Sequence, residues 1–323
     1  MVIMLFLLIK VILIMSVLFK NGSFITKNNF FVRTLKLLEF KKITKEWTGR
    51  EGWNSGIYEY LPFYTACPHG HKGLFSNDNQ LIASLSAVRY AKDFVFLGLF
   101  IVDPNYREVG IGEILAKTVL TELEEGTLLG LNGVKQQVGN YQRKYGFKPY
   151  HDNFRFSGRL KPQGFKNDFF EFGEKIKIIG QENLDINQLI EYDTSVFSYN
   201  REIFLRKWID MPGSYLLAAT EKDKICGYGV VSKCLNGVKI APLFAKNEKI
   251  AKNLCESFAS KFNGKLIQMD IPETNKSAIK LATQFGLHKT FETKRMYKGE
   301  EKLIDKHSKE INQIYSLTSL EIG

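Results

Sequence analysis

The chain has 323 residues, of which 44% are hydrophobic and 24% are charged. These proportions exclude an intrinsically disordered chain, and the length gives room for about two domains. The net charge of +11 favours an anionic partner but does not choose between a nucleotide, a nucleic acid and an acidic membrane surface. The four cysteines form no CxxC pair and no disulfide-scaffold spacing, which indicates reduced thiols.

Residues 1–19 form an apolar leader with one charged side chain, Lys10. The run is long enough to span a bilayer, but a charge near its middle costs about 2.5–3.5 kcal/mol on insertion scales. Three interpretations stay open: a membrane anchor, a cleaved signal peptide, or a leader that the working protein lacks because translation starts later. We expect a cytoplasmic protein, or one anchored in the membrane and facing the cytosol if the leader is retained.

An α/β pattern begins after the leader. The apolar periodicity predicts, in chain order, a strand, a helix and two further strands, at residues 31–35, 37–47, 72–76 and 81–90. Glycine-broken loops lie at 51–56 and 67–73. The second loop contains His69 and His71, but no Cys or Asp at a suitable spacing accompanies them, so we expect no metal site there.

The most informative stretch is FVFLGLFIVDPNYREVGIG, residues 94–112. It predicts a buried strand, 94–102, that leads through a glycine-containing turn into a helix. The first N–H groups of a helix have no intrahelical partner, and together with the helix dipole they favour a bound anion such as a phosphate. We expect Gly110 and Gly112 to let the phosphate approach the backbone, because neither carries a Cβ.

The second half of the chain repeats the element order of the first. The first half closes with a strand at 128–134, a short helix that ends near 145 and a strand at 148–156. The second half is predicted to contain strands at 225–231, 237–240, 265–271 and through 295–297, and helices at 248–262 and 275–286. Pro104 and Gly146 are 42 residues apart, and Pro242 and Gly286 are 44 apart. This repetition indicates an ancient duplication of one α/β fold.

With Arg107-x-x-Gly110-x-Gly112 between a strand and a helix, the sequence resembles the GNAT superfamily of acyl-CoA-dependent N-acetyltransferases. A strand end with Val102 and Pro104 adds to the likeness, as does the late Gly-Phe pair at 146–147.

The second half looks like the C-terminal domain of a two-domain branch of that superfamily. The likeness rests on residues 239–245, on Asp270-Ile-Pro272 with Asn275, and on residues 292–297. It implies two tandem GNAT-like domains, each a mixed, mostly antiparallel twisted sheet flanked by helices. We expect a leader and linker at 1–29, an acetyl-CoA-binding domain at 30–160, a linker at 161–175 and a GNAT-like domain at 176–323.

The resemblance also implies the residues that hold acetyl-CoA, the expected co-substrate. The strand end that pairs with pantetheine falls on Phe100, Ile101 and Val102. The turn that holds the pyrophosphate falls on Arg107, Glu108, Val109, Gly110, Ile111 and Gly112, and Asn140 is a further contact. The second half has Pro-Leu-Phe-Ala-Lys-Asn-Glu, 242–248, in place of the glycine turn, so only the first half is expected to bind acetyl-CoA.

Acetyl transfer to an amine needs a polarised thioester carbonyl, a base for the amine and a proton for the leaving thiolate. The strand 94–102 carries no titratable side chain, so the candidate base is Glu51 in the first glycine-broken loop. Because Gln142 occupies the family's usual tyrosine position, Tyr141 and Tyr145 are the candidate proton donors.

Three residues are candidates for the acceptor site, and each has a structural alternative. Trp53 and Asn54 follow the candidate base, and as core anchors they are equally plausible. Arg89 lies on a predicted strand, where it contacts an anionic substrate group or pairs with a neighbouring carboxylate.

The leading interpretation is an N-acetyltransferase that moves an acetyl group from acetyl-CoA to a small-molecule amine by direct attack of the amine on the thioester. The alternative is a non-catalytic acyl-CoA-binding protein of the same fold, since the usual base is missing. A nucleic-acid binder is disfavoured because no stripe of interleaved aromatic and basic residues is present. No metal is expected, membrane association would come only through residues 1–19, and the acceptor amine and oligomeric state stay open.

Overall fold

The computed structural model describes residues 18–20, 23–25, 30–159 and 176–323. Most of the apolar leader and the predicted linker at 161–175 therefore lie outside the described residues. Two short paired strands, β1 (Leu18–Lys20) and β2 (Ser23–Ile25), come first. Within the described part of the chain, every helix is too short or too polar to cross a bilayer.

Five strands of the first half lie side by side in chain order. They are β3 (Phe30–Thr34), β4 (His71–Ser76), β5 (Leu81–Ala91), β6 (Phe94–Val102) and β7 (Leu128–Val134). Neighbours are antiparallel except β6 and β7, which run parallel. The five strands predicted for this region are confirmed to within one residue at each end.

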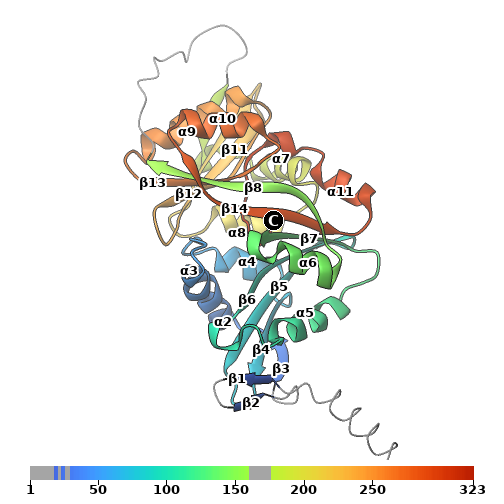
Figure 1. Ribbon diagram of the computed structural model, residues 1–323. Coiled ribbons are helices and arrows are strands. Elements are labelled where there is room, and N and C mark those ends of the chain that lie inside the picture. The colour runs from blue at the N-terminus through green and yellow to red at the C-terminus, as the bar shows by residue number, and fades with distance from the viewer. Residues whose placement is uncertain (1–17, 21–22, 26–29, 160–175) are drawn as a thin grey trace, which may run out of the picture.

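The helices of the first half cover this part of the sheet and its edge (Figure 1). They are α2 (Leu37–Lys42), which continues through a π-helical turn at Ile43–Trp47 into α3 (Thr48–Arg50), then α4 (Tyr60–Ala66), α5 (Ile111–Thr121) and α6 (Val138–Tyr145). The helix predicted at 37–47 is confirmed at its start and runs three residues further. Its Phe40, Ile43 and Trp47 are buried, as their helical spacing predicts.

The second half repeats the arrangement in reverse order along the sheet. Its strands are β9 (Lys177–Gly180), β10 (Tyr215–Glu221), β11 (Lys224–Lys233), β12 (Val238–Ala245) and β13 (Leu266–Pro272). Its helices are α7 (Ile186–Phe197), α8 (Glu202–Ile209), α9 (Glu248–Lys261), α10 (Lys276–Gln284) and α11 (Glu301–Ser308). The two-domain α/β fold predicted from the sequence is confirmed.

One predicted strand end is wrong: β12 does not stop before Pro242 but continues to Ala245. Proline cannot donate to a strand ladder, so it is tolerated inside a sheet only at an edge or a bulge. The register between β11 and β12 shifts at this place, because Gly229 pairs with Leu243 while Val231 pairs with Ile240. Pro242 therefore lies in a bulge, where its missing N–H breaks no ladder bond.

The last strand of each half lies in the other half's part of the sheet. β14 (His288–Lys298) pairs with β7, β8 (Lys148–Arg159) pairs with β13, and β14 and β8 pair with each other. All these strands form one sheet, which β14 and β8 cross at its middle (Figure 1). The boundaries 30–160 and 176–323 stay a prediction, and each of these segments completes the sheet of the other.

Helices from the two halves also pack against each other. The rings of Phe63 on α4 and Trp208 on α8 are stacked, with centroids 6.0 Å apart. Phe204 on α8 joins them, 6.4 Å from Phe63, and all three side chains are buried. The halves thus share an apolar core as well as a sheet.

Candidate functional site

A cavity opens where β6 and β7 part. The two strands pair only over Phe94–Leu97 and Leu128–Leu131, and their remaining residues diverge. The cavity has a volume of about 590 Å³. Its walls come from β6, β7, the start of α5, α6, the loop at 51–53, and, from the second half, β14 and residues 320–321.

A bulge in β6 shapes one wall of this cavity. Ser84 pairs with Ile101 and Ser86 pairs with Gly98, so Leu99 and Phe100 both stand opposite Leu85. Leu99 has a φ of 49°, a left-handed conformation that costs a non-glycine residue about 1–3 kcal/mol. Bulges of this kind take backbone groups out of the ladder and often lie beside functional sites.

The predicted cofactor strand lies on the cavity. Phe100, Ile101 and Val102 all line it, next to the bulge. Beyond Leu97 the side of β6 that faces β7 has no strand partner among the described residues, which leaves its backbone available to an extended ligand.

The glycine turn also lies on the cavity, at the N-terminus of α5. Gly110 is the N-cap, with a φ of 81°, and no side chain caps the helix. Among the residues that the structure describes, nothing lies within 4 Å of the position that a Cβ would take at Gly110, so they leave the space in front of the helix open. The N–H groups of Ile111 and Gly112, at the start of the helix, precede its first i→i−4 acceptors. This is the geometry expected for an anion site.

Gly112 lies where α5 packs on β6. A Cβ at this position would lie 3.2 Å from the ring of Phe100 and 3.2 Å from Val102. Such contacts are tighter than ordinary van der Waals contact, so the glycine lets α5 pack closely on β6. That both glycines admit the phosphate stays a prediction, and the open space at Gly110 leaves room for it.

Arg107 and Glu51 meet at the edge of the cavity. The Arg107 Nε donates to the Val102 carbonyl at 2.9 Å, and its Nη2 lies 2.5 Å from the Glu51 carboxylate. Both residues line the cavity. The guanidinium therefore holds the turn against the strand end, and the predicted base is ion-paired with it.

Helix α6 presents three predicted residues to the cavity: Asn140, Tyr141 and Tyr145. Burial raises the pKa of Tyr141 well above its ordinary value, and a Cβ on Gly133 of β7 would lie 3.0 Å from its ring. Burial and, to a smaller extent, the Glu113 charge also raise the pKa of Tyr145. Both phenols therefore stay protonated at neutral pH, as a proton donor must.

Of the three predicted acceptor residues, only Trp53 lines the cavity. The Asn54 side chain is bonded to the backbone of Asn236 at 2.9 and 2.7 Å, which ties its loop to the second half. Arg89 lies outside the cavity, where it donates to the Lys92 carbonyl at 3.1 Å and lies 3.7 Å from Glu124.

His71 of the second glycine-broken loop is a packing residue. Its two ring nitrogens lie 2.8 Å from the Ser86 hydroxyl and 3.0 Å from the Phe63 carbonyl. Burial lowers its pKa to about 4, so the imidazole stays neutral at physiological pH.

Sequence reasoning missed several residues of the cavity wall. These are Asn132 on β7, Phe291 and Thr293 on β14, and Leu320 and Glu321. Asn132 is the cross-strand partner of Arg295, whose Nε donates to it at 2.8 Å. Only the exchange of the last strands brings β14 to this place, and no local pattern signals that exchange.

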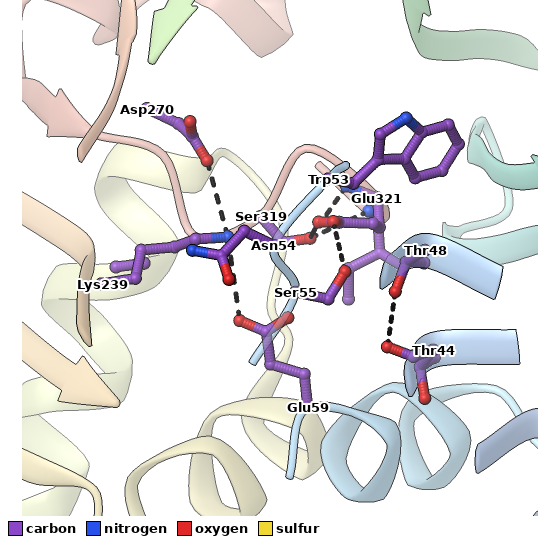
Figure 2. Close-up of polar contacts among 12 residues, drawn as sticks. Thr44, Thr48, Trp53, Asn54, Ser55, Glu59, Lys239, Asp270, Ser319 and Glu321 are labelled. Carbon is purple, nitrogen blue, oxygen red and sulfur yellow. Dashed lines mark hydrogen bonds and ion pairs between the residues drawn. The ribbon is translucent and has the colours of Figure 1, made fainter. Parts of the chain in front are cut away.

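A fully buried cluster of charges lies beside Glu321 (Figure 2). Arg155 makes two bonds to Asp270, at 2.7 and 2.9 Å. The Lys239 ammonium lies 3.6 Å from Asp270 and 4.0 Å from Glu59. Burial raises the pKa of Glu59 to about 7, although the Lys239 charge opposes the shift. The cluster links β8, β12, β13 and the start of α4.

In the second half, the corresponding place is filled by the chain itself. Asn247 caps α9 by accepting a bond from the Ile250 N–H at 3.0 Å. A short strand, β15 (Ile314–Ser316), pairs with β12 at Leu243 and Phe244 and lies beside β13. The slot that is open between β6 and β7 is thus occupied between β12 and β13.

Two family models match the chain, one in each half. The model of the Acetyltransferase (GNAT) family matches residues 38–147, which include β6, the glycine turn and α6. The model of the Acetyltransferase (GNAT) domain matches residues 189–315.

The chain is also similar along most of its length to individual proteins of this kind. The holothin acyltransferase of Pseudoalteromonas sp. (strain SANK 73390) is 25% identical over 287 residues, which cover 88% of this chain and 92% of that protein. The uncharacterized N-acetyltransferase YitH of Bacillus subtilis (strain 168) is 21% identical over 70% of this chain and 76% of that protein.

Solved structures share the two-domain fold. A proposed acetyltransferase from Pyrococcus horikoshii aligns with a TM-score of 0.72 and 18% identity, over 94% of this chain and 99% of that chain. A tandem GNAT protein from the clavulanic acid biosynthesis pathway aligns with a TM-score of 0.59 and 12% identity, over 83% of this chain and 98% of that chain.

Proposed function

Because the chain belongs to the GNAT superfamily, with one such domain in each half, we propose that it is an acetyl-CoA-dependent N-acetyltransferase acting on a small-molecule amine. The family and the acyltransferase relatives support acyl transfer as the class of reaction. The observation that carries the proposal is the cavity between β6 and β7, which joins an unpaired strand edge to an uncapped helix N-terminus.

The first half binds the donor in this proposal. The backbone of Phe100 to Val102 pairs with the pantetheine arm, since this edge of β6 has no strand partner on the cavity side. The pyrophosphate binds the N–H groups at the start of α5, and residues 107–112 form the turn that surrounds it. Asn140 contributes from α6. Arg107 acts through the turn, because its guanidinium already bonds Val102 and Glu51.

The acceptor amine enters from the opposite end of the cavity, where Trp53 and Phe291 provide an aromatic wall. Its nitrogen attacks the thioester carbonyl directly. A backbone N–H freed by the bulge at Leu99 and Phe100 polarises that carbonyl, as in an oxyanion hole. A tyrosine of α6 then protonates the leaving thiolate.

A single changed side chain tests the pyrophosphate site. Gly110→Asp places a carboxylate at the start of α5, where it repels the pyrophosphate and competes for the helix N–H groups. Gly110→Asn is the matched control, because Asn tolerates the same left-handed backbone without the charge. We expect the Kd of acetyl-CoA, measured by isothermal titration calorimetry, to be about 10- to 100-fold higher for the Asp variant than for the Asn variant. Equal affinities would place the pyrophosphate elsewhere.

The stoichiometry of binding tests whether only the first half binds acetyl-CoA. We expect one acetyl-CoA per chain, because Asn247 and β15 fill the equivalent place in the second half. Calorimetry that gives two sites per chain would contradict this.

Turnover separates the proposed enzyme from a non-catalytic acyl-CoA-binding protein. Acetyl-CoA is incubated with spermidine, glucosamine or tyramine, free thiol is followed, and the product is identified by mass spectrometry. An acetylated amine supports the enzyme. Tight binding of acetyl-CoA without thiol release supports the binding protein.

A further inference from the structure

The last ten described residues, Ile314 to Gly323, connect the two halves. The segment starts as β15 in the second half and ends between the halves, where Figure 1 marks the C-terminal end. The Leu317 N–H donates to the Asp270 carbonyl at 2.7 Å, and Asn132 Nδ2 of the first half donates to the Leu320 carbonyl at 2.9 Å. The Tyr90 hydroxyl donates to the Ile322 carbonyl at 2.8 Å. These bonds fix the backbone on both sides of Glu321.

Glu321 lies against β6 at the residue that precedes the bulge. A Cβ on Gly98 would lie only 1.6 Å from the Glu321 carbonyl oxygen, so a side chain at this position is incompatible with the observed packing. Gly98 and Leu99 both line the cavity, as does Glu321. The segment therefore places Glu321 where the proposed thioester carbonyl meets the acceptor.

Two hydroxyl groups hold the Glu321 carboxylate (Figure 2). The Ser55 Oγ donates to one oxygen at 3.0 Å, and the Ser319 Oγ donates to the other at 2.6 Å. A carboxylate accepts about four bonds, so both oxygens keep capacity for a further donor. Glu321 is only 4% exposed and is one of the residues that line the cavity, so bulk water has little access to it.

The other carboxylates of the cavity are placed differently. Of the described residues that line it, four carry a carboxylate: Glu51, Glu108, Glu113 and Glu321. Glu51 is paired with Arg107, and Glu113 with Lys117 and Lys144. Glu108 is exposed on the turn beside Gly110. Only Glu321 is both buried and next to the bulge of β6.

We propose that Glu321 is the catalytic base of the acyl transfer and that the acceptor is a small molecule bearing an ammonium group. The inference rests on the proposed function. The carboxylate binds the ammonium and takes its proton, the freed nitrogen forms a bond to the acyl carbon, and the bond from that carbon to sulfur breaks. The thiolate leaves and is protonated by a tyrosine of α6, which regains its proton from solvent. Glu321 releases the first proton to solvent and then takes the second proton of the nitrogen as the new bond to carbon forms.

The charges around Glu321 fit this role. Arg155 and Lys239 are the cations that interact with it, and Asp270 and Glu59 pair with them. Both cations are buried and already have these carboxylate partners. The ammonium of an incoming substrate therefore has Glu321 as its counter-charge at the cavity wall.

The test compares Glu321→Gln with the wild type and with Glu300→Gln, an exposed carboxylate before α11 that serves as control. Turnover with spermidine, glucosamine and tyramine is followed as thiol release, and acetyl-CoA affinity by calorimetry. We expect Glu321→Gln to bind acetyl-CoA normally, which shows that it is folded, and to lower kcat at pH 7 by about 10²- to 10⁴-fold. Glu321→Asp, which keeps a carboxylate, is expected to recover part of the rate.

The pH profile separates a base from a structural residue. The loss of kcat in Glu321→Gln, relative to the wild type, should become smaller as the pH approaches the pKa of the amine, because the solution then supplies the neutral amine. A deficit that is the same at every pH, or a kcat within about threefold of the wild type, overturns the proposal.

Acceptor-free hydrolysis of acetyl-CoA, in which water replaces the amine, is the second readout. If the wild type acetylates none of the three amines, the proposed acceptor class fails, but hydrolysis still tests the base. Slower hydrolysis by Glu321→Gln supports the proposal. Where none of the amines is acetylated, equal hydrolysis by wild type and variant overturns it.

Discussion

Asp270→Ala is expected to lower the free energy of unfolding by about 3–5 kcal/mol, because it removes the carboxylate partner of the buried Arg155 and the nearer of the two carboxylates beside the buried Lys239. Asp270 is fully buried and forms a two-bond pair with Arg155, and Lys239 lies 3.6 Å away. Urea denaturation measures the loss. Asp270→Asn keeps the volume but removes the charge, so most of the loss should persist in that variant.

An exposed ion pair provides the control. Glu202 and Arg206 on α8 are 2.8 Å apart, and each side chain is 44% exposed. Pairs of this kind contribute less than about 1 kcal/mol. If Glu202→Ala and Asp270→Ala destabilised the protein equally, the buried pair would not be a main determinant of stability.

The effect of Asp270 depends on pH in a defined direction. Burial raises the pKa of Asp270, but the charges of Arg155 and Lys239 outweigh it and hold the pKa below the ordinary value. A depressed carboxyl pKa contributes stability above the unfolded pKa of about 3.9, and the contribution is lost as the pH falls through the folded pKa. The difference in the free energy of unfolding between the wild type and Asp270→Asn should therefore become smaller as the pH falls.

The position of the pair adds a cooperative consequence. Arg155 on β8 belongs to the first half of the sequence, Asp270 on β13 to the second, and the two residues are direct cross-strand partners. Since each half completes its sheet with the other's last strand, neither can unfold alone without breaking this pairing. We expect a single transition for both halves, in the wild type and in the variant.

The strand exchange shows where sequence reasoning reaches its limit. Alternation and turn residues predicted the strand at 148–156, and it exists as β8. Periodicity reports which face of a segment is buried, but not which strand lies beside it. The partner of β8 is set by contacts more than a hundred residues away, so its place in the sheet could not be read from the local sequence.

Helix α4 was missed for a different reason. It has seven residues, with Pro62 among them, and so short a segment shows too few turns to reveal a period. Yet its Phe63 stacks on Trp208 and helps to join the two halves. Short elements that depend on tertiary packing leave little trace in the sequence.

The candidate site was predictable where its residues are local. The strand, the turn and the helix start at 94–112 are contiguous, and the cavity has this segment as one wall. Side-chain direction was not predictable: Arg89 and Asn54 have suitable chemistry but lie outside the cavity. Glu321 and Phe291 are more than 170 residues from the turn, and only the fold brings them to it.

Tyr141→Phe is expected to lower kcat by about 10²-fold and to change the KM of acetyl-CoA by less than about threefold, because its hydroxyl acts only as the thiolate leaves. The Tyr141 ring packs on Gly133, in the part of β7 that has diverged from β6. Its pKa is raised by burial, so the hydroxyl remains a proton donor beyond the ordinary tyrosine range. Thiol release under saturating acetyl-CoA measures kcat.

Tyr145→Phe distinguishes the two tyrosines of α6. Glu113, in the first turn of α5, contributes to the raised pKa of Tyr145, so this ring lies near the N-terminus of α5, where we propose that the pyrophosphate binds. Removal of the Tyr145 hydroxyl should therefore raise the KM of acetyl-CoA more than it lowers kcat. A kcat loss in Tyr145→Phe but not in Tyr141→Phe would assign the proton donor to Tyr145. If both variants keep full kcat, the proton that protonates the thiolate comes from water, and neither phenol takes part in the chemical step.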